Sequence, residues 1–191
     1  ARTYESVLEH LKPRYLLGLT ATPERADTKD ILKWFGGRTA VELRLWDALE
    51  QELLSPFHYF GIHDEKDLRN VTWRRGRGYD TDELTKVYTA DDRWATMVLQ
   101  SVQEKMGDPK RMRALGFCVS IAHAQFMAQK FEQAGLQATA VTSETPATQR
   151  EAALQGLRDG AMQVLFTVDL FNEGVDVPAI DAVLMLRPTE S

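Results

Sequence analysis

The sequence predicts an α/β fold in which helices flank a parallel sheet. From residue 115 onward, short apolar runs alternate with segments in which apolar residues recur every three or four positions. Glycine or proline stands at the boundaries between these segments, as at positions 135, 146 and 160. Because strands that alternate with helices pair in parallel through right-handed crossovers, we expect this half of the chain to form one open sheet.

The elements of this half follow from local signals. Apolar runs predict strands at 115–120, 138–141, 164–167 and 182–186, and helical spacing predicts helices at 123–133 and 146–157. Thr145 is a suitable cap for the second of these helices because Pro146 then takes its first position, where the missing N–H of proline costs nothing.

The preceding stretch is less regular. Residues 64–82 are polar, rich in arginine and glycine and without periodicity, so we expect a connecting loop or an insertion there. Thr89 and Asp92 then form a capping-box pattern. The helix that follows has apolar residues four positions apart on one face, namely Trp94, Val98, Val102 and Met106. This face is expected to pack into the core.

The beginning of the chain has the pattern of a βα unit that lacks its first part. Periodicity predicts helices at 4–11, after Asp27 or Thr28, and at 48–54, with strands at 15–19 and 56–62. Pro13 and Gly36 are expected to end the first two helices. The strand at 56–62 would open a second domain, so we divide the chain into residues 1–52 and 53–191.

The composition is that of an ordinary globular domain. The 191 residues are 43% hydrophobic, with a net charge of -5 and a pI near 5.4, which argues against coating nucleic acid by bulk electrostatics. No apolar run approaches the roughly 18 residues that span a bilayer, and the start lacks the layout of a signal peptide, so we expect a cytoplasmic protein without a membrane partner. The single cysteine, Cys118, lies in an apolar run and is expected to be buried.

Positive charge gathers in two places despite the acidic balance. The clusters comprise Arg69, Arg74, Arg75 and Arg77, and then Lys110, Arg111 and Arg113. Each cluster has two interpretations, a narrow basic track for an anionic partner or charge on a solvated loop. The four histidines show no metal-ligand spacing, so we infer no metal ligand among them.

The most informative stretch is 164–178, where an apolar run opens into the polar loop Asn-Glu-Gly-Val-Asp-Val-Pro. At the carboxyl end of a strand in an open α/β sheet, the chain turns away and leaves a crevice that is the usual ligand position. Gly174 allows a ligand or a second backbone to approach closely. Asp176 suits a ribose hydroxyl or an attacking water, since an ionised carboxylate only accepts hydrogen bonds, but it could also cap the turn before Pro178.

This loop resembles motif V of superfamily 2 helicases, and two further tracts resemble motifs of the same superfamily. The run Leu-Gly-Leu-Thr-Ala-Thr-Pro-Glu-Arg at 17–25 is similar to motif III, and Gly-Phe-Cys-Val-Ser-Ile-Ala-His-Ala at 116–124 is similar to motif IV. The whole chain looks like the end of the first and most of the second RecA-like domain of the type III restriction-like and excision-repair-like group. The resemblance implies a RecA-like, P-loop NTPase-type sheet, with a helicase C-terminal domain preceded by a partial first domain.

The resemblance also implies roles for individual residues. It implies that Thr20, Ala21 and Thr22 couple the nucleotide state to nucleic-acid binding. Nucleic acid would be bound by Ser120, Thr142, Ser143, Thr167 and Asp169. ATP would be bound by Glu173, Gly174 and Asp176. Plainer interpretations exist beside these: a turn of hydroxyl residues at 20–22, turn chemistry at 142–143, and a helix cap at Ser120. His123, near the same helix start, is expected to be structural rather than catalytic.

The function that the resemblance implies is an ATP-dependent DNA or RNA helicase or translocase, with DNA favoured as the partner and ATP with Mg²⁺ as cofactors. No Gly-x-x-x-x-Gly-Lys-Ser/Thr pattern occurs in the sequence. The Walker A and B segments are therefore expected upstream and motif VI downstream, and most ligands of ATP and Mg²⁺ are expected in those segments. This fragment would then hold no complete catalytic set, and we expect it to be inactive alone. An inactive helicase-like scaffold for nucleic acid or protein is the alternative. A Rossmann-like transferase would explain neither the 20–23 tract nor the motif order.

Overall fold

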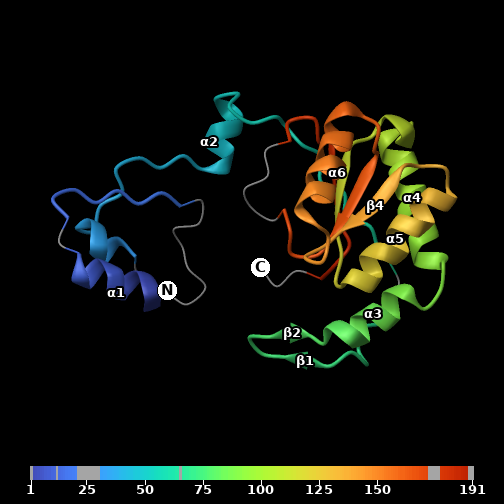
Figure 1. Ribbon diagram of the computed structural model, residues 1–191, viewed down its shortest axis with the longest axis horizontal. Coiled ribbons are helices and arrows are strands. Elements are labelled where there is room, and N and C mark those ends of the chain that lie inside the picture. Colours follow the sequence, from blue (N-terminus) through green and yellow to red (C-terminus); the bar gives the residue numbers. More distant parts are fainter. Residues whose placement is uncertain (1, 12, 21–30, 65, 172–176, 189–191) are drawn as a thin grey trace. The chain divides into compact units, whose positions relative to one another are not determined.

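The computed structural model divides the chain into two compact units, Ala1–Phe60 and Gly61–Ser191. It describes residues 2–11, 13–20, 31–64, 66–171 and 177–188 (Figure 1). The boundary between the units falls eight residues after the predicted one at 52/53. No helix in the described ranges is long and apolar enough to cross a membrane.

The first unit contains little regular structure. Its described residues form the α-helices α1 (Arg2–His10) and α2 (Leu45–Glu50) and the 3-10 helix η1 (Leu32–Phe35). The strands predicted at 15–19 and 56–62 are wrong, because these residues have irregular backbone and no ladder partner among the described residues of the unit. The helix predicted at 48–54 is shifted and ends at Glu50. Ala48 is the one residue of this unit that the described ranges show as buried.

The second unit is built on a four-stranded parallel sheet. Its strands are β3 (Ala114–Phe117), β4 (Ala138–Val141), β5 (Val164–Thr167) and β6 (Ala182–Met185), in the order β4-β5-β3-β6. The helices between them are α5 (Ile121–Gln133) and α6 (Ala147–Asp159), preceded by α4 (Arg93–Met106) and the 3-10 helix η2 (Pro109–Arg111). The prediction of a parallel α/β sheet is confirmed, and β4 and β5 have the predicted bounds.

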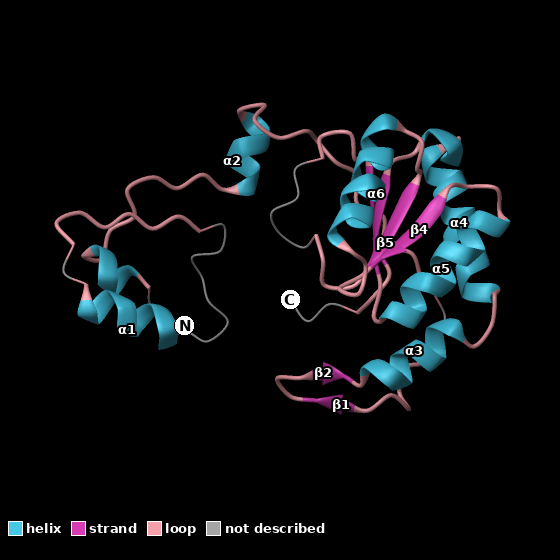
Figure 2. Cartoon of the chain, viewed as in Figure 1, coloured by secondary structure: helices cyan, strands magenta, loops and turns pink. Residues whose placement is uncertain are grey.

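Helices cover both faces of this sheet (Figure 2). One buried cluster joins α4 and α5 to one face and includes Val98 and Phe166. The other joins α6 to the opposite face and includes Leu157 and Leu165. Leu165 and Phe166 are neighbours in β5 and enter different clusters, because successive side chains of a strand point to opposite faces. The three-layer arrangement therefore follows from a strand that is apolar on both sides.

Gly116 in the inner strand β3 leaves room for a large side chain of the first cluster. Gly116 lies beside Phe166 in the register of β3 and β5, and a Cβ at position 116 would collide with the phenyl ring. The ring occupies that space and contacts Phe131 edge-on, with ring centroids 4.9 Å apart. Any larger residue at position 116 would force this core to repack.

The stretch 64–82, predicted as a loop or insertion, is a folded arm. It forms the antiparallel hairpin β1 (Trp73–Arg74) and β2 (Gly78–Tyr79), and α3 (Thr81–Thr89) follows directly. Asp80 caps α3, because its carboxylate accepts hydrogen bonds from the amides of Asp82 and Glu83, both at 3.1 Å. The loop prediction failed because short strands and a polar helix start give weak periodicity.

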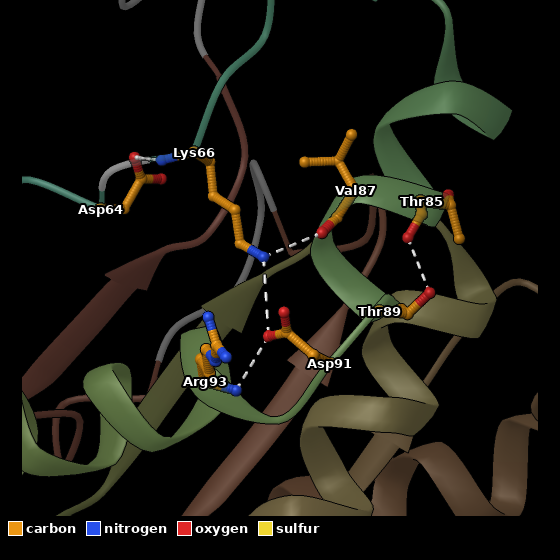
Figure 3. A network of polar contacts seen from close by, with 7 residues as sticks. All are labelled: Asp64, Lys66, Thr85, Val87, Thr89, Asp91 and Arg93. Carbon is orange, nitrogen blue, oxygen red and sulfur yellow. Dashed lines mark hydrogen bonds and ion pairs between the residues drawn. The ribbon is translucent and has the colours of Figure 1, made fainter.

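The capping box predicted from Thr89 and Asp92 is also wrong. Thr89 is the last residue of α3, where its hydroxyl donates to the Thr85 carbonyl at 2.7 Å. Asp92 holds the N-cap position of α4 without a side-chain cap bond, and Asp91 accepts from the Arg93 amide instead, at 3.0 Å (Figure 3). Thr89 is unavailable as a cap because α3 continues through it.

Lys66 joins the segment before the hairpin to the C-terminal end of α3 (Figure 3). Its ammonium group donates to the Val87 carbonyl at 3.1 Å and lies 3.8 Å from a carboxylate oxygen of Asp91. The Lys66 amide donates to Asp64 at 3.2 Å. A cation at the C-terminal end of a helix satisfies free carbonyls and complements the helix dipole. The segment before the hairpin is thus tied to the helix after it.

Candidate functional site

The polar residues that follow the four strands lie at one edge of the sheet. Phe117 is in register with both Thr167 and Met185, and Thr167 is in register with Val141, so the four strands end at the same level. The residues just beyond these ends are Ser120, Thr142, Ser143, Asp169 and Arg187. This carboxyl edge is where ligands bind in open α/β sheets, so it is the candidate site.

Ser120 caps α5, as the sequence predicts. Its backbone is extended and its hydroxyl oxygen accepts from the His123 amide at 3.1 Å. A second hydrogen bond, 2.7 Å long, joins the hydroxyls of Ser120 and Thr85. Because the Thr85 hydroxyl also lies 2.7 Å from the Thr81 carbonyl, all three contacts are satisfied when Ser120 donates to Thr85 and Thr85 donates to Thr81. The Ser120 proton is therefore engaged within the protein.

His123 is a structural residue of the core beneath this cap. It is completely buried, its ring stacks on Tyr88 with centroids 5.3 Å apart and planes 6° apart, and it also contacts Trp94. The Val119 amide donates to its Nδ1 at 3.4 Å. Burial lowers the pKa of His123 to about 4 and raises the pKa of Tyr88 to about 12. The imidazole is neutral at pH 7 and has no access to a substrate.

Thr142 and Ser143 form a tight turn after β4. The Thr142 amide donates to the Thr145 hydroxyl at 2.9 Å, and the Glu144 amide donates to the Thr142 hydroxyl at 3.3 Å. Thr142 is buried, whereas Ser143 is exposed. The turn borders an open cavity of about 410 Å³ between α5, β4 and the start of α6. Of the pair, only Ser143 presents its hydroxyl to solvent.

The loop after β5 has an unusual backbone. Asp169 and Phe171 adopt φ values of +53° and +66°, a left-handed region that costs a non-glycine residue of order 1 kcal/mol or more. The Asp169 carboxylate accepts from Nη1 of Arg187 at 2.6 Å. Thr167 lies fully buried at the strand end, and its hydroxyl has no partner among the described residues. Only Asp169 of these two predicted binding residues reaches solvent.

Several predicted site residues lie outside the described ranges. These are Ala21, Thr22, Glu173, Gly174 and Asp176. Thr20 belongs to the first unit and is exposed. The predicted coupling and ATP-binding roles of these residues therefore stay predictions.

Two residues of the site were missed by the sequence analysis. Arg187 lies two residues after the end of β6 and pairs with Asp169, and a cation close to the end of a predicted strand was the available signal. Thr85 has no comparable signal, because its contact with Ser120 depends on how α3 packs against α5. Cys118, by contrast, is buried as predicted, and burial raises the pKa of its thiol well above the usual range.

Comparison with known proteins gives consistent matches. Residues 98–191 match the family model of the helicase conserved C-terminal domain. A 51.5 kDa protein of a Lactococcus phage (isolate 7-9) is 28% identical over 100% of this chain and 40% of its own length. IRC3 of Saccharomyces cerevisiae, named as an ATP-dependent helicase, is 26% identical over 100% of this chain and 28% of its own. Rad25 of Halobacterium salinarum, named as a DNA 3'-5' helicase, is 27% identical over 88% of this chain and 26% of its own.

The fold and these matches together support a helicase-family protein. The chain carries a helicase C-terminal domain, and its four-stranded parallel sheet flanked by helices is the RecA-like fold that the sequence predicts. The predicted resemblance to helicases is confirmed. The chain spans 40% of the length of the phage protein and 28% of that of the yeast helicase.

Proposed function

We propose that this chain is part of an ATP-dependent helicase or translocase that couples ATP hydrolysis to movement on nucleic acid. The observation that carries the proposal is the carboxyl edge, where loops after all four strands of a helicase-family domain meet. Hydroxyl groups and backbone amides at such an edge bind the phosphate backbone without reading its sequence. A motor that moves along a strand needs contacts of this kind.

The residues of the edge would divide this work. Ser143 would donate its exposed hydroxyl directly to a phosphate, while the Thr142 turn would orient it. Ser120 would donate to phosphate only by exchanging its bond to Thr85. Asp169 would act through Arg187, because an exposed carboxylate repels phosphate whereas the guanidinium that it holds attracts it.

ATP and Mg²⁺ would be bound mostly by other parts of the protein. No three carboxylate, histidine or cysteine side chains lie together among the described residues in a way that could hold a metal ion. Glu173, Gly174 and Asp176 would contribute to the nucleotide site, with Asp176 accepting hydrogen bonds from a ribose hydroxyl or a water. We therefore expect the 191-residue chain by itself neither to bind ATP tightly nor to hydrolyse it.

DNA is the favoured partner in this proposal. Rad25, which matches over 88% of this chain, is named as a DNA helicase. In the full-length protein, ATP would draw two RecA-like domains together and hydrolysis would release them, so that each cycle advances the protein along the strand.

The proposal is tested by measuring ATPase activity of the full-length protein with no nucleic acid, single-stranded DNA, duplex DNA or RNA. We expect stimulation that is largest with DNA and that falls by 10²-fold or more in Asp176→Ala, because Asp176 would lie in the nucleotide site. Asp159→Ala, which removes an exposed carboxylate at the end of α6, is the matched control and should keep wild-type activity.

The outcomes separate the motor from its alternative. Nucleic-acid stimulation that disappears only in Asp176→Ala supports the motor. A folded full-length protein that binds nucleic acid but shows no ATPase activity under any condition would favour the non-catalytic scaffold.

A further inference from the structure

The β1–β2 hairpin carries positive charge that the helicase-like motifs do not include. Its seven residues, 73–79, contain Arg74, Arg75 and Arg77 and no acidic residue, although the chain as a whole has a charge of -5. All three side chains are exposed, and no carboxylate among the described residues pairs with them. Arg69 differs, because it is held by Asp67 at 2.7 Å. In the described part of the chain, no ion pair with a carboxylate therefore neutralises the three hairpin cations.

The turn concentrates these groups at one tip. The Arg77 amide donates to the Arg74 carbonyl at 2.9 Å, so the three arginines surround a single tight turn. Gly76 and Gly78 have φ values of +74° and +77°, which a residue with a side chain would adopt only under strain. The glycines thus permit the tight turn around which Arg74, Arg75 and Arg77 are placed.

An aromatic side chain stands next to this tip. Trp73 lies opposite Tyr79 in the register of the hairpin, so both rings are on the same face. Tyr79 packs against the core, whereas 53% of the Trp73 surface is exposed. An exposed indole beside several guanidinium groups matches the chemistry of an unpaired base with its neighbouring phosphates.

The base of the hairpin is fixed to the domain. The Glu83 carboxylate of α3 accepts from the Thr72 amide at 2.6 Å and from the Thr72 hydroxyl at 3.2 Å. The Asp80 amide closes the base by donating to the Thr72 carbonyl at 2.8 Å. Val71, just before it, is buried in the core. The tip is therefore preorganised, which lowers the entropy cost of binding a partner.

The arm lies at the same end of the domain as the candidate site. Thr85 of α3 contacts Ser120 at the carboxyl edge, and Thr81 is one helical turn, about 6 Å, further along α3 toward the hairpin. Figure 1 shows the hairpin extending from that end of α3. A strand bound at the carboxyl edge would thus pass within reach of the tip.

We propose that the hairpin is a second nucleic-acid contact, in which Arg74, Arg75 and Arg77 bind successive phosphates and Trp73 stacks on a base of a single strand. The inference rests on the proposed function, because it assigns the partner of the carboxyl edge to the hairpin as well. It adds a binding element that lies outside the helicase motifs.

The test measures binding of fluorescent single-stranded DNA by the full-length protein at several salt concentrations. One variant combines Arg74→Gln, Arg75→Gln and Arg77→Gln, and a second is Trp73→Leu. The matched control combines Lys105→Gln, Lys110→Gln and Arg111→Gln, which removes the same charge from exposed positions that precede β3, at the amino end of the sheet. Thermal melting checks that all three variants keep the fold.

The arginine variant should bind less tightly and with a weaker salt dependence. Loss of three phosphate contacts would make the slope of log K against log salt shallower by about 2, which is about 100-fold in affinity at 0.1 M salt. Trp73→Leu should lose roughly 5- to 150-fold with little change in slope. The control variant should stay close to wild type.

The possible failures are distinguishable. If the hairpin variants bind like the control while wild type is stimulated by DNA, the hairpin proposal is overturned and the proposed function stands. Equal weakening in the arginine variant and the control would mean bulk electrostatics and would also overturn it. If wild type binds no nucleic acid and is not stimulated by it, both proposals fail.

Discussion

His123 shows how a single residue makes the stability of the second unit depend on pH. Its folded pKa of about 4 lies below the ordinary value of 6.5, so the unfolded chain takes up a proton at a pH where the folded chain does not. The stability that comes from the neutral imidazole is complete above pH 6.5 and is lost as the pH falls toward 4. We expect His123 to account for about 2 kcal/mol of lost unfolding free energy between pH 7 and pH 5.

Urea unfolding at the two pH values measures this loss. His123→Phe keeps a ring between Tyr88 and Trp94 and removes the titrating group, so its loss should be smaller than that of wild type by about 2 kcal/mol. His63→Phe removes an exposed imidazole from the same unit and should behave like wild type. An equal pH dependence in wild type and His123→Phe would contradict the assignment.

Residue roles were predictable from the sequence where one element supplies all the partners. Ser120 was assignable as a cap because the cap and the amide that it binds are three positions apart. Its bond to Thr85 spans 35 positions and depends on tertiary packing, which no local pattern encodes. The Asp169–Arg187 pair has the same character, since parallel strands bring together residues that are distant in the chain.

Glu83 of α3 forms the main connection between this helix and the base of the β1–β2 hairpin. We expect Glu83→Ala to speed hydrogen exchange at the Thr72 amide by roughly tenfold or more, because the amide loses a charged acceptor. Exchange at Arg77 and at Asp80 should also accelerate, as the hairpin loosens at its base. The amides within α5 should be unaffected.

Glu104→Ala is the matched control for this experiment, because Glu104 is exposed on α4. Native-state hydrogen exchange followed by NMR resolves these amides individually. Unchanged protection at Thr72 and Arg77 in the Glu83 variant would show that the carboxylate does not hold the hairpin.

The elements predicted best are those whose burial matches their sequence pattern. The strands β4 and β5 are short, apolar and bounded by turn residues, and their predicted bounds are the observed ones. α3 was missed because its cap, Asp80, and its first residue, Thr81, lie inside a stretch that is rich in arginine and glycine. Its buried apolar positions, Leu84 and Tyr88, are also few. The apolar run at 15–19 was misjudged for the opposite reason, since a strand pattern forms no strand without a neighbour.

The two units differ in how many residues they contribute to the buried hydrophobic clusters. Both buried clusters consist of residues from position 68 onward, and Ala48 is the buried residue described in the first unit. We therefore expect residues 61–191 alone to unfold in one cooperative transition, and residues 1–60 alone to show none. Thermal melting followed by circular dichroism tests both fragments.

The comparison with the 191-residue chain is the control for these fragments. Its transition should match that of 61–191 within a few degrees, because the first unit adds little buried surface. A fragment 61–191 that fails to fold, or a cooperative transition in 1–60, would mean that the units do not divide the stability in this way.

Cys118 has a practical consequence for chemical labelling. It is the single thiol of the chain, it is fully buried at the end of β3, and its amide donates to the Thr167 carbonyl of β5 at 2.8 Å. Only an exposed thiolate attacks a disulfide reagent, so labelling requires an excursion that uncovers this junction. The labelling rate therefore reports how often the β3–β5 pair opens at this junction, and no cysteine has to be introduced to measure it.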